Sequence, residues 1–303
     1  MSCNDTLYLP YSCGEVTNTL YDEETPVALS LAVLWNKWAP VGKGAIPRLL
    51  GRFFGSTLRY SYISSKYGAY LVIEPTSLDV YAHMINHGKT WNEHVFDACK
   101  TFLKKGSVFY DIGANIGYMS IEMAKAFNDK VQVISFEPQP LLAHSIALSS
   151  KLNKFNNLRV FDLMLGESLG KANLYIGSHS IHASAIAREK HSLCISRPVA
   201  TIDYMVETGC IPPPNVIKLD IEGGELAALA GAKKTICTNR PYIIFESDEN
   251  MNRFGYSRKN IIDQIKTMGL YDFYFIHSTN CRLVKFNEEN SSSCYTDILA
   301  IPL

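Results

Sequence analysis

The stretch Asp111-Ile-Gly-Ala-Asn-Ile-Gly117 decides the fold, because it joins an apolar run to an amphipathic helix. The apolar run is residues 108–112, and the helix is predicted over residues 116–127 from apolar residues that recur at helical spacing. On this helix, Glu122 falls on the polar face. Glycines at a turn from strand to helix let the backbone approach a ligand and let both elements pack closely. The stretch therefore predicts the first strand, turn and helix of a parallel sheet.

Similar apolar runs recur on both sides of this stretch and alternate with helical segments. The runs are residues 108–112, 131–136, 158–163, 216–219 and 242–245, and the helical segments are residues 116–127, 139–151 and 224–236. Alternation at this spacing predicts an α/β domain with a largely parallel, buried sheet. Three further runs, residues 271–277, 282–286 and 296–301, have no helix between them. They predict an antiparallel addition to the edge of the sheet. A strand and a helix are also predicted earlier, at residues 69–74 and 92–104.

Two acidic residues flank the predicted ligand site. Asp111 stands before the first glycine, and Glu137 follows the second strand, 26 residues later, in Phe136-Glu137-Pro138. A dinucleotide fold would have G-x-G-x-x-G here, but residue 115 is asparagine, and the Asp111 carboxylate would repel a pyrophosphate. An NAD-dependent oxidoreductase is therefore disfavoured. An acid after the second strand can accept hydrogen bonds from both ribose hydroxyls. The pair suits a positively charged nucleoside such as S-adenosylmethionine.

A third acidic segment, Asp220-Ile-Glu222-Gly-Gly-Glu225, follows the strand at residues 216–219. Ligands of doubly wound sheets bind off the carboxyl ends of the strands, which places Asp220 in the predicted crevice. Its carboxylate could orient the donor or the acceptor of a reaction, or take the acceptor's proton, and Glu222 could share that role. Glu225 lies in the first turn of the next helix, where capping is its ordinary role.

A polar loop between the third and fourth strands carries histidines. The histidines are His179 and His182, with His191 nearby. His182 competes with the acidic residues for the role of general base, and the alternative is that all three are ordinary loop histidines. No metal site is predicted, since no acid or cysteine accompanies the histidines at tight ligand spacing.

The charge and cysteine content indicate which partners and which compartment to expect. The 303 residues contain 29 lysines and arginines and 29 aspartates and glutamates, so the formal net charge is zero. This balance argues against a dominant nucleic-acid or anionic-membrane footprint, which would need a clustered basic excess. The eight cysteines include no Cys-x-x-Cys pair and are predicted to be reduced thiols of a cytoplasmic protein. No signal peptide is predicted, and no apolar run reaches the roughly 20 residues of a membrane span.

The N-terminal region is predicted to be an extension or cap of helices and loops, residues 1–67, on a main domain of residues 68–303. Residues 27–35 follow Thr25-Pro26, an N-cap and a helix-starting proline, and are predicted to form a partly buried helix. A basic cluster in this region consists of Lys43, Arg48 and Arg52. It is either a solvated face or a surface for an anionic substrate. The region is expected to select the substrate and to supply the contact of a homodimer.

Five motifs resemble those of the FkbM family of S-adenosylmethionine-dependent methyltransferases, and the resemblance covers residues 68–303. They are Asp111-Ile-Gly-Ala-Asn-Ile-Gly-Tyr118, Ser135-Phe-Glu-Pro138, Thr201-Ile-Asp203, Ile217-Lys-Leu-Asp-Ile-Glu-Gly-Gly-Glu225 and Arg240-Pro-Tyr-Ile-Ile-Phe-Glu246. The resemblance implies a Rossmann-like class I methyltransferase fold. Its sheet would have seven mostly parallel strands, the last antiparallel, with helices on both faces.

The implied activity is transfer of a methyl group to oxygen, usually a hydroxyl on a sugar, glycolipid or secondary metabolite. S-adenosylmethionine would be the donor and S-adenosylhomocysteine the product. The expected partner is a small-molecule or glycan acceptor, without nucleic acid and without a membrane span. The alternative is a non-catalytic nucleoside-binding or partner-binding module on the same fold.

The resemblance also assigns residues to the donor. Those expected at its methionine end are Asp111, Gly113, Asn115 and Gly117. Those expected at the ribose and adenine are Glu137, with Pro138 beside it, and Leu163 and Met164. Glu93 falls where the family has an acid just ahead of the first strand of the domain, and it is expected to approach the donor. Asp220 and Glu222 fall in the family's acidic motif, where Gly224 replaces a more common alanine.

Overall fold

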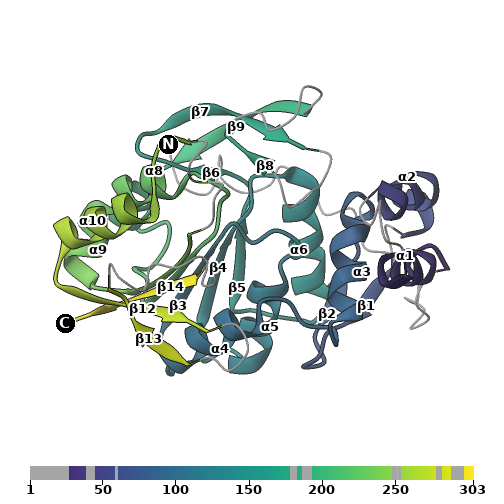
Figure 1. Ribbon diagram of the computed structural model, residues 1–303, viewed down its shortest axis with the longest axis horizontal. Coiled ribbons are helices and arrows are strands. Elements are labelled where there is room, and N and C mark those ends of the chain that lie inside the picture. The colour runs from purple at the N-terminus through teal and green to yellow at the C-terminus, as the bar shows by residue number, and fades with distance from the viewer. Residues whose placement is uncertain are drawn as a thin grey trace.

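The computed structural model describes residues 27–38, 45–58, 61–177, 183–185, 193–247, 251, 254–277, 282–287 and 297–303. Its centre is a sheet whose strand order is β13-β12-β14-β11-β10-β3-β4-β5 (Figure 1). The strands are β3 (Val108–Ile112), β4 (Gln132–Phe136), β5 (Leu158–Phe161), β10 (Val216–Leu219), β11 (Tyr242–Glu246), β12 (Tyr271–Ile276), β13 (Leu283–Lys285) and β14 (Asp297–Pro302). All eight coincide with apolar runs in the sequence, so the predicted α/β sheet is confirmed.

The strands are parallel and antiparallel where the sequence predicts it. The five strands β5, β4, β3, β10 and β11 are parallel to their neighbours, whereas β14 is antiparallel to both β11 and β12. Strand β13 adds an antiparallel edge to β12. The resemblance implied seven strands, and among the described residues the sheet has one more, because residues 283–285 pair at the edge.

Helices cover both faces of the sheet, and successive strand residues point to opposite sides. Phe109 packs into the core on the side of α4 (Glu93–Thr101), α5 (Tyr118–Phe127) and α6 (Pro140–Leu152). Its neighbour Tyr110 packs into the other core, with α7 (Ile202–Glu207), α8 (Glu225–Ala230), α9 (Lys233–Asn239) and α10 (Arg258–Met268). The predicted helix 224–236 is two helices, α8 and α9, separated by Gly231 and Ala232.

A second, smaller sheet was not predicted. Its order is β6-β9-β7-β8, with β6 (Met164–Leu165), β7 (Gly170–Ile176), β8 (Ala183–Ser184) and β9 (Leu193–Ala200). Figure 1 shows it above the upper edge of the main sheet. Strand β7 buries only Leu174, so its sequence has little apolar alternation to reveal a strand.

The N-terminal elements pack at one end of the main domain, at the right of Figure 1. They are α1 (Val27–Trp38), α2 (Ala45–Leu58), β1 (Tyr62–Ser64), β2 (Tyr70–Val72), the 3-10 turn η1 (Pro75–Ser77) and α3 (Leu78–Asn86). The predicted helix at residues 27–35 and strand at 69–74 are confirmed. Strand β2 is anchored to α6, because the Val72 N–H donates to Ser149 Oγ at 2.8 Å. The predicted boundary between residues 67 and 68 falls in the turn that joins β1 to β2.

One helix position differs from the sequence pattern. Glu122 was placed on the polar face of α5, but its side chain is 0% exposed. The prediction that this face is polar is wrong at Glu122, because strand β2 packs over α5. Burial raises the pKa of Glu122 to about 7. The Ser65 side chain and the Lys125 charge lower this pKa, but burial is the larger effect.

None of the described helices combines the length and the hydropathy that crossing a lipid bilayer requires.

Candidate functional site

A cavity of about 280 Å³ lies at the carboxyl ends of β3, β4, β5 and β10. This is the edge at which parallel α/β sheets bind ligands. The small sheet contributes a wall through Leu174 and β8. The predicted site residues that line the cavity are Gly113, Asn115, Glu137, Pro138, Leu163, Met164, Asp220 and Glu222. The structure therefore brings together residues that are more than 100 positions apart in the chain.

The turn after β3 passes very close to the loop after β10. Gly113 has a φ of +82°, and a Cβ atom on this residue would lie 1.8 Å from the carbonyl oxygen of Asp220. Only glycine fits this position, both because of its left-handed conformation and because of the contact. The Gly113 N–H donates to the carbonyl oxygen of Phe136 at 3.0 Å, which ties the turn to the end of β4. The glycine turn thus fixes three strand ends relative to one another.

Glu137 lies at the end of β4 and is held by backbone amides. Its Oε2 accepts the N–H of Asn115 at 2.8 Å, and its Oε1 accepts the N–H of Gln139 at 2.9 Å. Burial raises the pKa of Glu137 to about 7, although both amide donors favour the charged form. The carboxylate is therefore positioned on the cavity wall, where it could accept a ligand hydroxyl.

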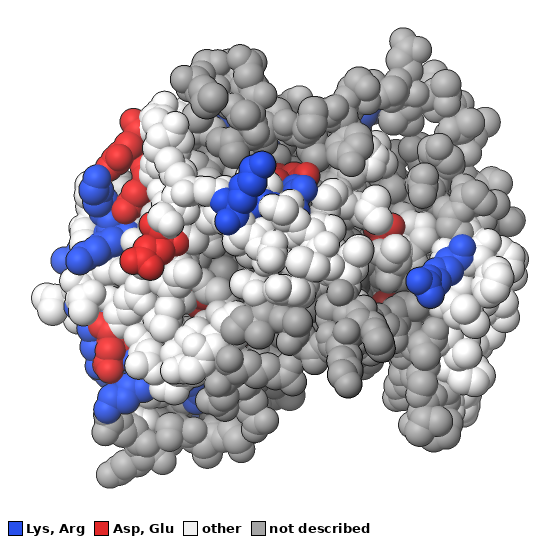
Figure 2. Space-filling view, turned by 90° about the horizontal axis from the view of Figure 1, so that it is seen from above, with Lys and Arg blue, Asp and Glu red and all other residues white. Residues whose placement is uncertain are grey.

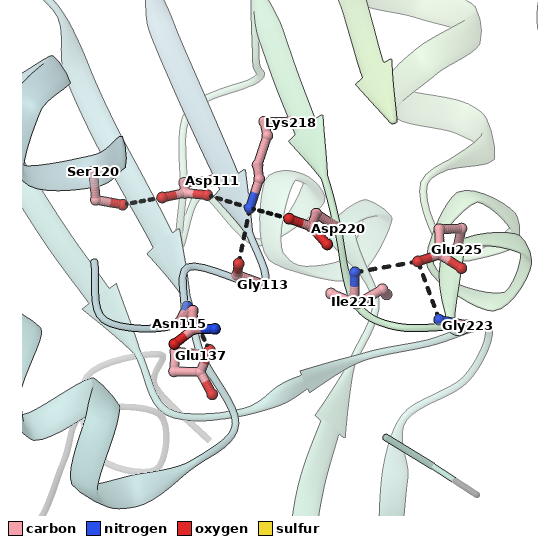
Figure 3. A network of polar contacts seen from close by, with 10 residues as sticks. All are labelled: Asp111, Gly113, Asn115, Ser120, Glu137, Lys218, Asp220, Ile221, Gly223 and Glu225. Atoms are coloured by element: carbon pink, nitrogen blue, oxygen red, sulfur yellow. Dashed lines mark hydrogen bonds and ion pairs between the residues drawn. The ribbon is translucent and has the colours of Figure 1, made fainter. Parts of the chain in front are cut away.

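A buried lysine joins two of the predicted acidic residues (Figure 3). Lys218 Nζ lies 3.2 Å from Asp111 Oδ1 and 3.3 Å from Asp220 Oδ2. It also donates to the carbonyl oxygen of Gly113 at 2.9 Å. Burial lowers the pKa of Lys218, but Asp220 and Asp111 outweigh this effect, so the net direction is upward and the lysine is charged.

Asp111 lies behind this lysine and does not line the cavity. It is 0% exposed, and Ser120 Oγ donates to its Oδ2 at 2.6 Å. Gly117 also lies outside the cavity lining, with a φ of +80° at the start of α5. The predicted contact of Asp111 and Gly117 with the donor stays a prediction.

Three carboxylates gather at the ends of β10 and β11. One oxygen from each of Asp220, Glu222 and Glu246 lies within 4.8 Å of the others, and all three residues line the cavity. Carboxylates at this spacing could hold a hard cation such as Mg²⁺. No metal site was predicted from the sequence at this position.

Glu225 has the capping role that the sequence suggested. Its Oε1 accepts the N–H groups of Ile221 and Gly223, both at 3.2 Å, as Figure 3 shows. Its Oε2 accepts the hydroxyl of Tyr256 at 2.5 Å. These bonds hold the 220–224 loop, in which Glu222 has a left-handed φ of +59°.

Glu93 lies beside the cavity rather than in its lining. Its carboxylate forms an ion pair with Lys66 and accepts the hydroxyl of Tyr67 at 2.7 Å. The side chains just before it, Trp91 and Asn92, do line the cavity. The predicted approach of Glu93 to a donor is therefore not tested by its position.

The histidine predictions fall largely outside the described residues. His179, His182 and His191 all lie in parts of the chain that the structure does not describe. The described neighbours Ala183, Ser184 and Ala185 line the cavity, so part of this loop faces the site.

Sequence reasoning missed several residues of the site. They are Lys218, Glu246, Val80, Asn92 and Met119. Trp91 also lines the cavity, and the sequence left open whether this aromatic stacks on a sugar or belongs to the core. A signal for Lys218 was available, because residues two apart in a strand point the same way and Lys218 precedes Asp220 by two. Val80 comes from α3, which had no predicted element, so nothing in the sequence pattern indicated it.

The chain is similar to known proteins in both family profile and sequence. The profile of the family described as "Methyltransferase FkbM domain" matches residues 111–274, which is more than half of the chain. The hexuronic acid methyltransferase AglP of Haloferax volcanii is 28% identical over 128 residues, which are 42% of this chain and 51% of that protein. The chain thus spans about half the length of this curated relative.

Solved structures of low sequence identity also resemble the chain. A methyltransferase FkbM from Methylobacillus flagellatus KT is 16% identical with a TM-score of 0.45, over 75% of this chain and 54% of that chain. A putative methyltransferase from Streptococcus mutans in complex with SAH is 8% identical with a TM-score of 0.41, over 70% of this chain and 97% of that chain.

Proposed function

Since the chain belongs to the FkbM methyltransferase domain family, we propose that it transfers a methyl group from S-adenosylmethionine to a hydroxyl oxygen. The acceptor class that we propose is a sugar, a glycolipid or a secondary metabolite. The observation that carries the proposal is the cavity at the carboxyl edge, where Glu137, the glycine turn and the acidic loop after β10 meet. The hexuronic acid methyltransferase among its relatives supports a sugar acceptor.

The residues present fit the donor. Asn115 lines the cavity, and its Oδ1 is buried without a hydrogen-bond partner among the described residues, so it could accept from an ammonium group. Glu137 would accept from the ribose hydroxyls, and Leu163 and Met164 offer apolar surface to the adenine. When bound, the donor supplies a methyl group on a positively charged sulfur.

The chain itself must orient the acceptor, exclude water and remove one proton. Alignment of reactants contributes about 7–11 kcal/mol in favourable cases, and a positioned base contributes roughly 10²- to 10⁴-fold. Asp220 and Glu222 are the proposed candidates for the base, with His182 as the competitor. The ion pair with Lys218 fixes the Asp220 carboxylate in position, which suits it to orient a hydroxyl.

Calorimetric titration with S-adenosylmethionine and S-adenosylhomocysteine tests the donor site. Both ligands should bind, and Glu137→Gln should weaken binding about 10- to 100-fold, because a hydrogen bond to a charged group contributes about 1.5–3 kcal/mol. The exposed Glu167→Gln is the matched control and should leave the affinity unchanged. Failure of both ligands to bind would exclude the proposed activity.

A labelled-methyl assay over a panel of free and lipid-linked uronic acids and sugars tests the acceptor class. With an accepted substrate, replacing the base should lower kcat about 10²- to 10⁴-fold while donor affinity stays within about threefold. The variants Asp220→Asn, Glu222→Gln and His182→Asn are compared. Full turnover in one of them removes that residue from the role, and donor binding without any transfer would favour the non-catalytic module.

Other features remain proposals from the sequence. They are an N-terminal extension over residues 1–67, a catalytic domain over residues 68–303, a homodimer through the N-terminal region, a cytoplasmic location and the absence of a nucleic-acid partner. The four described cysteines, Cys99, Cys194, Cys210 and Cys237, are free, which supports the reducing compartment.

A further inference from the structure

Helix α1 carries apolar side chains on two opposite faces. Ala28, Leu29 and Ala32 are buried against the rest of the protein. The outward face carries exposed apolar residues at positions 27, 31, 34 and 38, a spacing of four, three and four that forms one continuous helical stripe. Val27 and Trp38 at its ends are each 75% exposed. The burial of one face explains the fold of α1, but it does not explain the outward stripe.

Helix α2 presents a similar outward surface. Leu49 and Phe53 are exposed and lie four residues apart, which places them on the same side of the helix. Phe53 is 75% exposed. Helices α1 and α2 pack against each other, so the exposed apolar side chains of both belong to one helix pair. We call the exposed residues Val27, Leu31, Leu34, Trp38, Leu49 and Phe53 the outer face.

The charged residues within α1 and α2 are all basic. Neither α1 nor α2 contains an aspartate or a glutamate. The Lys37 ammonium lies 5.5 Å from the centre of the Trp38 ring, and Arg52 is exposed and adjacent in sequence to Phe53. At the right-hand edge of Figure 2, where these helices lie, the described atoms are white or blue. The zero net charge of the whole chain therefore averages over two helices that carry only basic charges.

We propose that the outer face docks onto the surface of an anionic lipid membrane. An amphipathic helix that binds such a surface inserts Trp, Phe and Leu side chains to the depth of the acyl boundary, while lysines and arginines contact the headgroups. The outer face has this chemistry, with Trp38 and Phe53 as the large inserting side chains and Lys37 and Arg52 beside them. Its helices lie on the surface and do not cross the bilayer, consistent with their length.

A second copy of the chain fits the outer face less well. A twofold contact brings the same surface of both copies together, so the Lys37 and Arg52 side chains of both copies would gather in one interface. With no acidic residue in either helix, nothing in these two elements offsets that repulsion. Anionic headgroups supply the opposite charge.

The docking helices are connected to the cavity by α3. Helix α3 packs against both α1 and α2, and Asn86 Nδ2 donates to the carbonyl oxygen of Val33 at 3.1 Å. The same helix contributes Val80 to the cavity wall. Helix α3 therefore contacts both the docking helices and the cavity. The inference does not depend on methyl transfer.

Vesicle flotation measures the binding of the protein to membranes directly. The full chain is mixed with two kinds of vesicle. One kind contains phosphatidylcholine alone, and in the other one third of the lipid is phosphatidylglycerol. Binding should be at least tenfold stronger to the anionic vesicles and should weaken as salt is added. The pair Lys37→Glu and Arg52→Glu should lower binding more than tenfold, since each basic side chain near an anionic surface contributes about fivefold. The pair Trp38→Ser and Phe53→Ser should lower it at least tenfold.

Matched controls keep the result specific. Lys105→Glu and Leu270→Ser change an exposed lysine and an exposed leucine elsewhere and should bind vesicles as the parent protein does. Titration with S-adenosylmethionine should give one affinity for all variants, which separates this result from the proposed function. Equal binding to both vesicle types, or no effect of either pair, would overturn the proposal. So would light scattering that shows two copies in the parent protein and one copy in the Trp38→Ser and Phe53→Ser variant.

Discussion

Lys218 illustrates how much one side chain can hold in place at the edge of a sheet. It is 7% exposed, and its ammonium contacts Asp111, Asp220 and the carbonyl oxygen of Gly113. Strand register places it directly opposite Asp111, because these two residues are paired across β3 and β10. The lysine therefore links the first motif of the sequence to the acidic loop after β10.

Replacing this lysine should destabilise the protein strongly. In Lys218→Met the length of the side chain is kept, but Asp111 is left buried without its cation, which typically costs about 3–5 kcal/mol. Urea unfolding should show this loss, whereas the exposed Lys105→Met should change stability by less than about 0.5 kcal/mol. Adding Asp111→Asn to Lys218→Met should recover part of the loss. A double variant as unstable as the single one would contradict the proposed cause.

Glu122 gives the protein a pH-dependent stability. Its pKa is raised from 4.5 to about 7 in the folded protein by burial. The folded state therefore keeps a proton that the unfolded state releases, and the stability present below pH 4.5 is lost as the pH rises through about 7. In Glu122→Gln this loss is absent. The variant should be more stable than the parent at pH 8, by on the order of 3 kcal/mol, and equally stable at pH 4.5.

Urea unfolding at both pH values checks this expectation. The exposed Glu167→Gln provides the control and should follow the parent at each pH. A constant difference between Glu122→Gln and the parent, independent of pH, would show that packing rather than ionisation is responsible.

At the scale of elements, the turn after β3 offers a matched pair of glycines. Gly113 and Gly68 have nearly the same φ, +82° and +79°, but only Gly113 has another atom within 4 Å of where a Cβ would lie. Gly68→Ala should cost about 1–2 kcal/mol from backbone strain alone. Gly113→Ala adds a collision with the Asp220 carbonyl, so it should cost more and also abolish binding of S-adenosylmethionine. Thermal unfolding and calorimetry measure both effects, and equal losses in the two variants would refute the collision.

The elements that the sequence predicted well are those with a strong apolar period. All eight strands of the main sheet were predicted, and the central ones are recognisable because strands buried on both faces are short continuous apolar runs. The small sheet and α3 were missed. In β7 only Leu174 is buried, so the physical signal that a strand leaves in its sequence is weak there. The partner strand β9 likewise buries only one residue, Ala200.

The residues of the site also divide into those that the sequence predicted and those that it did not. Glycines and acids at strand ends are recognisable because the chemistry of the ligand selects them, and eight of the predicted residues line the cavity. Lys218 lies within a quoted motif but received no role, because its place in the site depends on how β3 and β10 pair. The burial of Glu122 could not be read from α5 alone, because it results from β2, which lies more than 40 residues earlier.

At the scale of the whole molecule, the two apolar cores share one sheet, so the described residues should unfold as one unit. S-adenosylmethionine at 100 times its dissociation constant should then raise the free energy of unfolding by about 2.7 kcal/mol. Scanning calorimetry should show one transition that moves to higher temperature with the ligand, whereas NAD should leave it unchanged. Two separate transitions, with only one moving, would show that the cores are independent.

The small sheet has a closed base. Strand β6, which enters the small sheet, is parallel to the final residues of β9, which leaves it. Met164 is paired with Val199, and Leu165 is paired with Ala200. The chain therefore leaves and re-enters the main domain at neighbouring points. Because the two ends are already joined, a change in the length of the intervening segment adds little entropy cost, about 0.6 kcal/mol for each doubling of a loop. Because Leu174 and β8 in this segment line the cavity, a chimera that carries another sequence between Leu165 and Val199 should change which acceptor is used.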